Sequence, residues 1–256
     1  MADFLFSSER WSPLLWLDGL RAQIPTACVL CNGRTQGGGL CTGCIADWHY
    51  RYKQVRWRCQ RCKVAQLGGV ARVASQCQSC LDSSAVLQQL AVAFDYMMPL
   101  DSLIWRFKAR HQLRLAPVLA RMMQQAILRD GWSLPPDTQV AYIPSRPSAL
   151  QKRGFNPAAE LARYLARLLG YGFMYGALGL QQQDDGNAQK HRTQQQRRHY
   201  AQHAFVWQSA RTPSTLLLVD DVFTTGSTLQ AAGQCALAHG VSQVYGVVLA
   251  RVPWIM

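Results

Sequence analysis

Short apolar runs and longer helical patterns alternate along the chain from about residue 90 onward. The run Leu216–Val219 is apolar at every position, which is typical of a strand buried on both faces of a parallel sheet. Apolar residues recur with a helical spacing over 100–107 and over 115–127. Strands that alternate with helices predict an α/β fold with a parallel sheet. The other predicted strands are 91–96, 139–144, 203–207 and 243–250.

Between these elements, two polar segments and one further helix are predicted. Asn156 is a favourable N-cap and Pro157 suits the first helical position, so a helix is expected from there to about Gly170. The segment 145–154 before it is predicted to be a basic loop. The segment 181–202, rich in Gln and Arg, is predicted to be a mobile loop.

The pattern changes before residue 86, where cysteines replace the strand and helix signals. Residues 1–27 carry Trp and Leu with few charges and are predicted to be a short helical segment. We therefore expect three parts: the helical segment 1–27, a cysteine module 28–85, and an α/β domain 86–256.

Eight of the nine cysteines form four Cys-x-x-Cys pairs. Two such pairs facing each other supply the four thiolates of a tetrahedral zinc site, so the chain predicts two structural Zn²⁺ sites. Disulfides are the competing interpretation, disfavoured in a reducing compartment. Joining the first two pairs and the last two is the simplest arrangement, and interleaved pairing stays open. Cys235 is predicted to be a small buried apolar residue. The eight candidate ligands are Cys28, Cys31, Cys41, Cys44, Cys59, Cys62, Cys77 and Cys80.

The composition of the chain is typical of a globular protein. Its 256 residues are 49% hydrophobic, without an apolar run of membrane-spanning length. The N-terminus lacks the pattern of a signal peptide, so a cytoplasmic protein is expected. The formal charge is +13, and eight thiolates with two zinc ions would lower it to about +9. A polyanionic partner is consistent with that charge.

Aromatic and basic residues alternate over 48–58. Interleaved rings and cations can stack bases and pair with phosphates, as in proteins that bind single-stranded DNA. A spacer strand with one buried aromatic face explains the same pattern and is slightly favoured.

The segment that follows Leu216–Val219 carries the clearest chemistry. Asp220 and Asp221 end the strand and suit hydroxyl donors or a metal ion, whereas the hydroxyls of the next loop suit a phosphate. Gly226 allows the backbone to approach an anion closely, and the following helix N-terminus adds free N–H groups. The alternative is a strand-turn-helix with a solvated acidic turn. The pattern therefore predicts a ligand with both a diol and a phosphate. The loop hydroxyls belong to Thr224, Thr225, Ser227 and Thr228.

This segment resembles the phosphoribosyl-pyrophosphate (PRPP) motif of type I phosphoribosyltransferases. The resemblance implies that Asp220 and Asp221 hold the ribose hydroxyls and that Thr224–Thr228 hold the 5-phosphate, with Mg²⁺ bound together with PRPP. Arginine and lysine in the basic loop are candidates for binding pyrophosphate; a solvated basic loop explains them equally well. These candidates are Arg146, Lys152 and Arg153.

The order of motifs in this chain resembles that in the ComF family, which comprises the ComFC and GntX-type phosphoribosyltransferase-like proteins. The Cys-x-x-Cys pairs come first, then Tyr96 and Lys108, then Arg153-Gly154-Phe155-Asn156, then the PRPP motif. The resemblance implies a type I phosphoribosyltransferase fold behind a zinc-ribbon module, and a cytoplasmic role in DNA uptake or utilisation (competence) with DNA-processing partners. The chain departs from the family pattern at Pro157, usually Gln, and between residues 181 and 205.

Three functions follow from these observations. The first is a phosphoribosyltransferase that displaces pyrophosphate from PRPP. The second is a non-catalytic factor that binds single-stranded DNA or DNA-uptake proteins. The third is a regulator that senses PRPP without chemistry. The sequence leaves open whether the protein is an enzyme.

Overall fold

The computed structural model describes residues 23–55, 57–67, 75–82, 84–181 and 204–255. The chain divides into two compact units, with the division between His49 and Tyr50. Most of the predicted helical segment 1–27 and of the predicted mobile loop 181–202 lies outside the described residues.

The first unit contains a small antiparallel pair of strands. Strand β1 (Pro25–Ala27) pairs with β2 (Arg34–Gln36), so residues 25–27 are extended, although they belong to the segment predicted to be helical. Helix α2 (Thr42–Lys53) begins in this unit and ends beyond the division between the units.

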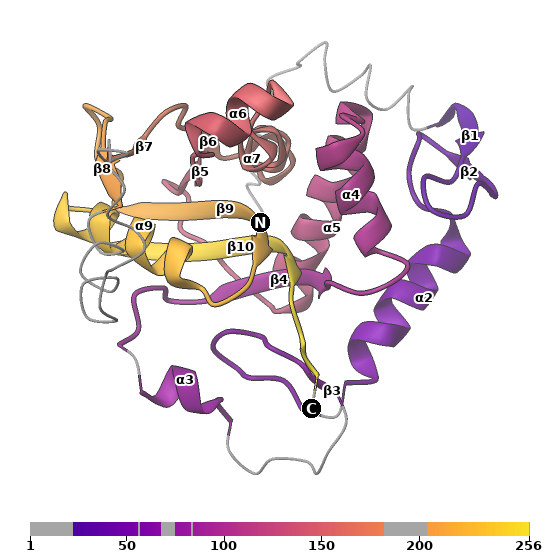
Figure 1. Cartoon of the computed structure of the whole chain (residues 1–256), viewed down its shortest axis with the longest axis horizontal. Helices are drawn as coiled ribbons and strands as arrows, with labels where there is room; N and C mark the ends of the chain where they lie inside the picture. Colours follow the sequence, from indigo (N-terminus) through magenta and orange to yellow (C-terminus); the bar gives the residue numbers. More distant parts are fainter. Residues whose placement is uncertain (1–22, 56, 68–74, 83, 182–203, 256) are drawn as a thin grey trace, which may run out of the picture. The chain divides into compact units, whose positions relative to one another are not determined.

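The second unit is built on a five-stranded sheet in which every paired strand is parallel (Figure 1). The predicted α/β class with a parallel sheet is confirmed. The strand that contains Leu216–Val219, called the motif strand below, lies at the centre of the sheet because it is apolar on both faces. In spatial order the strands are β4 (Leu90–Asp95), β10 (Gln243–Arg251), β9 (Thr215–Phe223), β5 (Gln139–Tyr142) and β6 (Gly172–Phe173).

One predicted strand lies elsewhere. Residues 205–207 form β8 (Phe205–Trp207), which pairs antiparallel with β7 (Leu178–Leu180) in a separate sheet and not with the motif strand.

Helices cover both faces of the large sheet. Helix α9 (Ser227–Ala238) packs on the face that carries Leu216 and Leu218. The intervening Leu217 and Val219 are equally buried and point to the opposite face, which α5 (Ala116–Arg129) and α7 (Pro157–Leu169) cover. The predicted cap of α7 is confirmed, since Asn156 Oδ1 accepts hydrogen bonds from the N–H groups of Ala158 and Ala159.

Three shorter helices are found among the described residues 101–153: α4 (Asp101–Ala109), the 3₁₀ helix η1 (Leu113–Leu115) and α6 (Pro147–Arg153). The presence of α6 corrects the prediction of a loop over 145–154. Pro147 suits the first helical turn and Gly154 ends the helix in the left-handed conformation at φ +71°.

The described residues between α2 and β4 contain little regular structure. They include β3 (Gln66–Leu67), which pairs with β11 (Trp254–Ile255) near the end of the chain, and the short helix α3 (Gln78–Leu81). Among the described residues, no helix has the length and hydropathy that a membrane crossing requires.

The aromatic-basic segment 48–58 is not a spacer strand, because residues 48–53 belong to α2. Trp48 and Trp57 are buried, whereas Tyr50 is exposed. The preference for packing over base stacking is therefore retained for these two tryptophans, of which Trp48 lies in a helix and Trp57 in the irregular segment that follows it.

Candidate functional site

The acidic pair lies at the carboxyl end of β9, where parallel α/β sheets bind their ligands. Asp221 Oδ2 lies 2.9 Å from the Nζ atom of Lys108, which projects from α4. The backbone N–H of Asp221 donates to Asp220 Oδ1 at 2.8 Å. The two carboxylates therefore differ: Asp221 is neutralised by a lysine, and Asp220 is held against the backbone.

Burial is the main cause of a raised pKa at Asp220. Burial first, and then the negative charge of Asp221, raise the pKa of Asp220 from its ordinary value to about 7, against smaller opposing effects of the Asp221 N–H and Lys108. At this pKa, the carboxyl group of Asp220 is partly protonated near neutral pH, so it can both accept hydrogen bonds from a diol and donate them to it.

The hydroxyl-rich loop joins β9 to α9. Thr225 Oγ1 and Ser227 Oγ lie 3.0 Å apart, and both side chains are exposed, as are those of Thr224 and Thr228. Gly226 adopts φ +86°, a left-handed conformation that β-carbons disfavour. A Cβ at this position would also overlap the ring of Phe223. The tight turn therefore requires glycine, and it leaves four hydroxyls and the N-terminus of α9 open to an anion.

The basic candidates lie beside this edge of the sheet. They follow β5, whose next residue, Ile143, donates its N–H to Val219 of β9 at 3.0 Å. Arg146, the N-cap residue of α6, and Lys152 within it are exposed, whereas Arg153 is half-buried and donates from Nε to the Ala149 carbonyl. The sheet register thus brings this segment next to the carboxyl end of β9.

Three residues of the Arg153–Asn156 element have structural roles. Gly154 ends α6. The ring of Phe155 packs edge-on against Phe107 of α4, with centroids 5.6 Å apart. Asn156 caps α7 and donates from Nδ2 to the Ile143 carbonyl at 3.0 Å. The element therefore fixes the end of β5 relative to the helix that carries Lys108.

The eight paired cysteines form two groups of four. The first cluster contains Cys28, Cys31, Cys41 and Cys44, and the second contains Cys59, Cys62, Cys77 and Cys80; within each, all sulfur atoms lie within 4.8 Å of one another. The simpler, sequential pairing is therefore the one that the fold adopts. Cys235 lies apart, buried in α9, where burial raises its pKa.

Both clusters have the geometry of a four-thiolate metal site. Cys31 Sγ and Cys41 Sγ lie 3.6 Å apart in the first cluster, and Cys62 Sγ and Cys77 Sγ lie 3.7 Å apart in the second. A regular tetrahedron with metal–sulfur bonds of about 2.3 Å separates its sulfurs by about 3.8 Å. Each cluster can hold a metal ion.

Backbone N–H groups also favour thiolates in both clusters. The N–H groups of Leu30 and Cys41 donate to Cys28 Sγ at 3.4 and 3.3 Å. In the second cluster, a hydrogen bond from Cys62 and then the N–H groups of Cys62 and Cys77 lower the pKa of the Cys59 thiol to about 4, against the opposing effect of burial. Such donors satisfy the sulfur charge that a metal leaves uncompensated.

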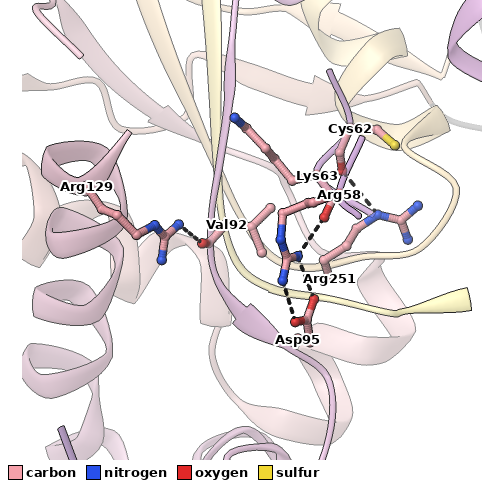
Figure 2. Close-up of polar contacts among 7 residues, drawn as sticks. All are labelled: Arg58, Cys62, Lys63, Val92, Asp95, Arg129 and Arg251. Atoms are coloured by element: carbon pink, nitrogen blue, oxygen red, sulfur yellow. Dashed lines mark hydrogen bonds and ion pairs between the residues drawn. The ribbon is translucent and has the colours of Figure 1, made fainter. Parts of the chain in front are cut away.

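Sequence reasoning missed three arginines, Arg58, Arg129 and Arg251, whose polar contacts are drawn in Figure 2. Arg58 makes two hydrogen bonds to the Asp95 carboxylate, at 2.9 and 2.8 Å, and its guanidinium lies 3.9 Å from the centre of the Tyr52 ring. Arg129 lies 3.5 Å from the same centre. Arg251, the last residue of β10, is only 4% exposed. A charged residue directly after the apolar run 243–250 was the available signal for Arg251.

No established family model matches the chain. The chain is 27% identical over 225 residues to the DNA utilization protein YhgH of Salmonella typhi, covering 86% of this chain and 95% of that relative. It is 26% identical over 235 residues to Competence protein F of Haemophilus influenzae, covering 88% of this chain and 96% of that relative.

A crystal structure of TT1426 from Thermus thermophilus is 16% identical, with a TM-score of 0.32 over 54% of this chain and 83% of that one; this likeness adds nothing to the fold. The agreement with the two relatives extends along nearly the whole chain. Together with the four Cys-x-x-Cys pairs and the acidic pair before a hydroxyl-rich loop, this agreement supports the resemblance to the ComF family.

Proposed function

We propose that this protein binds PRPP, or a related ribose 5-phosphate, at the carboxyl end of β9 and acts in DNA utilisation. The single observation that carries the ligand is the order of groups at that edge: a carboxylate pair with Lys108, then four exposed hydroxyls at a helix N-terminus. Asp220 and Asp221 would hold the ribose hydroxyls, and Thr224–Thr228 would hold the 5-phosphate.

The pyrophosphate of PRPP would extend toward the basic segment after β5. Arg146, Lys152 and Arg153 offer charges there that can neutralise a leaving pyrophosphate, since guanidinium groups grip such oxygens in pairs. Mg²⁺ would neutralise part of the pyrophosphate charge when bound with PRPP. Positioning and electrostatics would then suffice for a dissociative transfer.

The cellular role rests on the relatives. One is named a DNA utilization protein and another a competence protein. We extend that role to this chain, and with it a reducing cytoplasmic location, where eight thiolates can hold two structural Zn²⁺ ions.

Calorimetric titration of the zinc-loaded full chain with PRPP and Mg²⁺ tests the ligand. Binding in the micromolar range, about −8 kcal/mol, is expected. Asp221→Asn should weaken it at least about tenfold, because the ribose hydroxyls lose a charged acceptor. Glu160→Gln is the matched control, since Glu160 pairs with Arg163 on the surface of α7. Wild-type affinity in Asp221→Asn would contradict the site.

A separate measurement decides between transfer and sensing. Release of pyrophosphate in the presence of nucleobases indicates a phosphoribosyltransferase. PRPP binding without release for any acceptor indicates a sensor.

The formal charge of +13 favours a second candidate, direct binding of single-stranded DNA. Affinity for an oligonucleotide should then fall steeply as salt rises, because counterions are released from each contacted phosphate. Affinity that is independent of salt, or absent at low salt, would exclude this candidate.

A further inference from the structure

The buried side chain of Arg251 joins the second cluster to the hydroxyl-rich loop Thr224–Thr228. Arg251 ends β10, which lies between β9 and β4, and its Cα is in register with Phe223 on one side and Asp95 on the other. Its guanidinium donates from Nε to the carbonyl of the cluster residue Cys62 at 3.3 Å (Figure 2). The same group therefore faces a metal-ligand residue and the end of the motif strand.

The other arm of Arg251 holds the start of the loop. Nη1 donates to the carbonyls of Phe223, at 3.3 Å, and Thr224, and also to Val252 at 2.8 Å. The guanidinium lies 4.8 Å from the centre of the Phe223 ring. That ring in turn fills the space beside Gly226, the residue that sets the turn of the loop.

These contacts form a continuous path from Cys62 through Arg251 to Phe223, Thr224 and Gly226. Burial makes these contacts sensitive to small movements. If a partner carbonyl moves, the buried guanidinium loses a hydrogen bond that water does not replace. A metal ion bound by the Cys62 sulfur would restrain the carbonyl of the same residue.

From this path we infer that Arg251 is a positioning residue that couples metal binding at the second cluster to phosphosugar binding at the Thr224–Thr228 loop. The inference rests on the proposed function for its ligand. Coupling of this kind is reciprocal: PRPP must tighten zinc binding by the factor by which zinc tightens PRPP binding, typically about 5- to 150-fold.

Arg251→Lys is the informative variant, because it keeps the positive charge and loses the guanidinium fork that reaches the carbonyl groups of both Cys62 and Thr224. Arg58→Lys is its matched control. Arg58 also donates to the second-cluster segment, at the Lys63 carbonyl at 2.8 Å, but its fork reaches Asp95 of β4 and not the loop.

In the full zinc-loaded chain, Arg251→Lys should keep two zinc ions, weaken PRPP binding about tenfold, and speed amide exchange at residues 224–228. Arg58→Lys should also keep two zinc ions, and should leave the PRPP affinity and the amide exchange rates within about twofold of wild type. Equal effects of the two variants would overturn the inference in favour of general destabilisation, and wild-type behaviour of Arg251→Lys would overturn it outright.

The wild-type protein gives an independent test that does not require the variant to fold. PRPP should slow zinc loss to a chelator from the second cluster and not from the first; equal rates with and without PRPP would overturn the coupling. If the wild type binds no PRPP while Arg251→Lys still speeds loop exchange in the zinc-loaded chain, the positioning role stands and the proposed ligand fails.

Discussion

The two cysteine clusters have the same local geometry and different surroundings. In each, the residue after the second cysteine has a positive φ, +61° at Asn32 and +55° at Lys63. Its N–H donates to the first cysteine carbonyl, at 3.0 Å for Asn32 and 2.9 Å for Lys63. The same turn thus presents two sulfurs in both places, and the local sequence determines it.

Burial separates the two clusters. Cys31 of the first is exposed and Cys41 and Cys44 are half-buried. In the second, Cys59 and Cys77 are fully buried, with Trp57 and Val64 packed beside them. The first cluster closes a small unit, whereas the second is part of a core.

Polar contacts of the second cluster extend into the sheet domain. Arg58 binds Asp95, Lys63 lies 3.3 Å from Asp130, and Arg251 binds Cys62. The comparison teaches that the same Cys-x-x-Cys turn can either close a small local unit or form part of a larger core, depending on which side chains surround it.

The largest effect is expected from removing one ligand of each cluster in turn. Cys59→Ser should lower zinc content by about one ion and destabilise the sheet domain by several kcal/mol, because structural zinc contributes about 10 kcal/mol or more in small zinc-binding peptides. Cys28→Ser should also lower zinc content by about one ion, here from the first cluster, with little change in the main melting transition. Elemental analysis measures the zinc content of each variant, and thermal unfolding measures its melting temperature. Equal melting temperatures of the two variants would contradict the difference proposed between the two clusters.

Next comes the ion pair that anchors the second cluster to β4. Asp95→Ala should lower the free energy of unfolding by about 3–5 kcal/mol, because it leaves Arg58 charged and mostly buried without its partner. Glu160→Ala, which breaks the more exposed pair with Arg163, should cost less than about 1 kcal/mol. Urea titration measures both values, and a cost below about 1 kcal/mol for Asp95→Ala would show that the anchor is dispensable.

A pH titration separates the acidic pair from the clusters. The pKa of Asp220 is raised to about 7, so its carboxylate form is lost as pH falls through 7 and gained as pH rises. If the carboxylate accepts the ribose hydroxyls, PRPP affinity should increase about tenfold from pH 6 to pH 8. Asp220→Asn should remove that component and Cys28→Ser should preserve it. A profile shared by wild type and Asp220→Asn would refute the assignment.

The smallest effect concerns Tyr52, whose ring lies between Arg58 and Arg129. Tyr52→Leu should destabilise the sheet domain by about 1–2 kcal/mol, through the loss of two cation–π contacts. Tyr50→Leu is the control on the same helix, since Tyr50 is exposed. Chemical denaturation should rank the two variants in this order, and equal stabilities would mean that the stacking contributes nothing.

Much of this protein could be predicted from short stretches of sequence. Leu216–Val219 is apolar on both faces, so only the centre of a parallel sheet can bury it. Gly226 and the adjacent hydroxyls specify a tight turn into a helix, and Asn156 with Pro157 specifies the start of another. The first Cys-x-x-Cys pair of each cluster likewise defines its own turn. These features depend on steric and hydrogen-bonding preferences within a few residues.

Tertiary structure alone decided which distant groups meet. It paired the cysteines sequentially, brought Lys108 to Asp221, and placed the Arg251 guanidinium between Cys62 and Thr224. It also made 48–53 helical, although alternation suggested a strand. Such contacts join residues far apart in the chain, and they form only when packing of the sheet and helices offsets the loss of chain entropy. No local pattern encodes that balance, which is why the sequence determined the turns and the strand, and the fold determined how they meet.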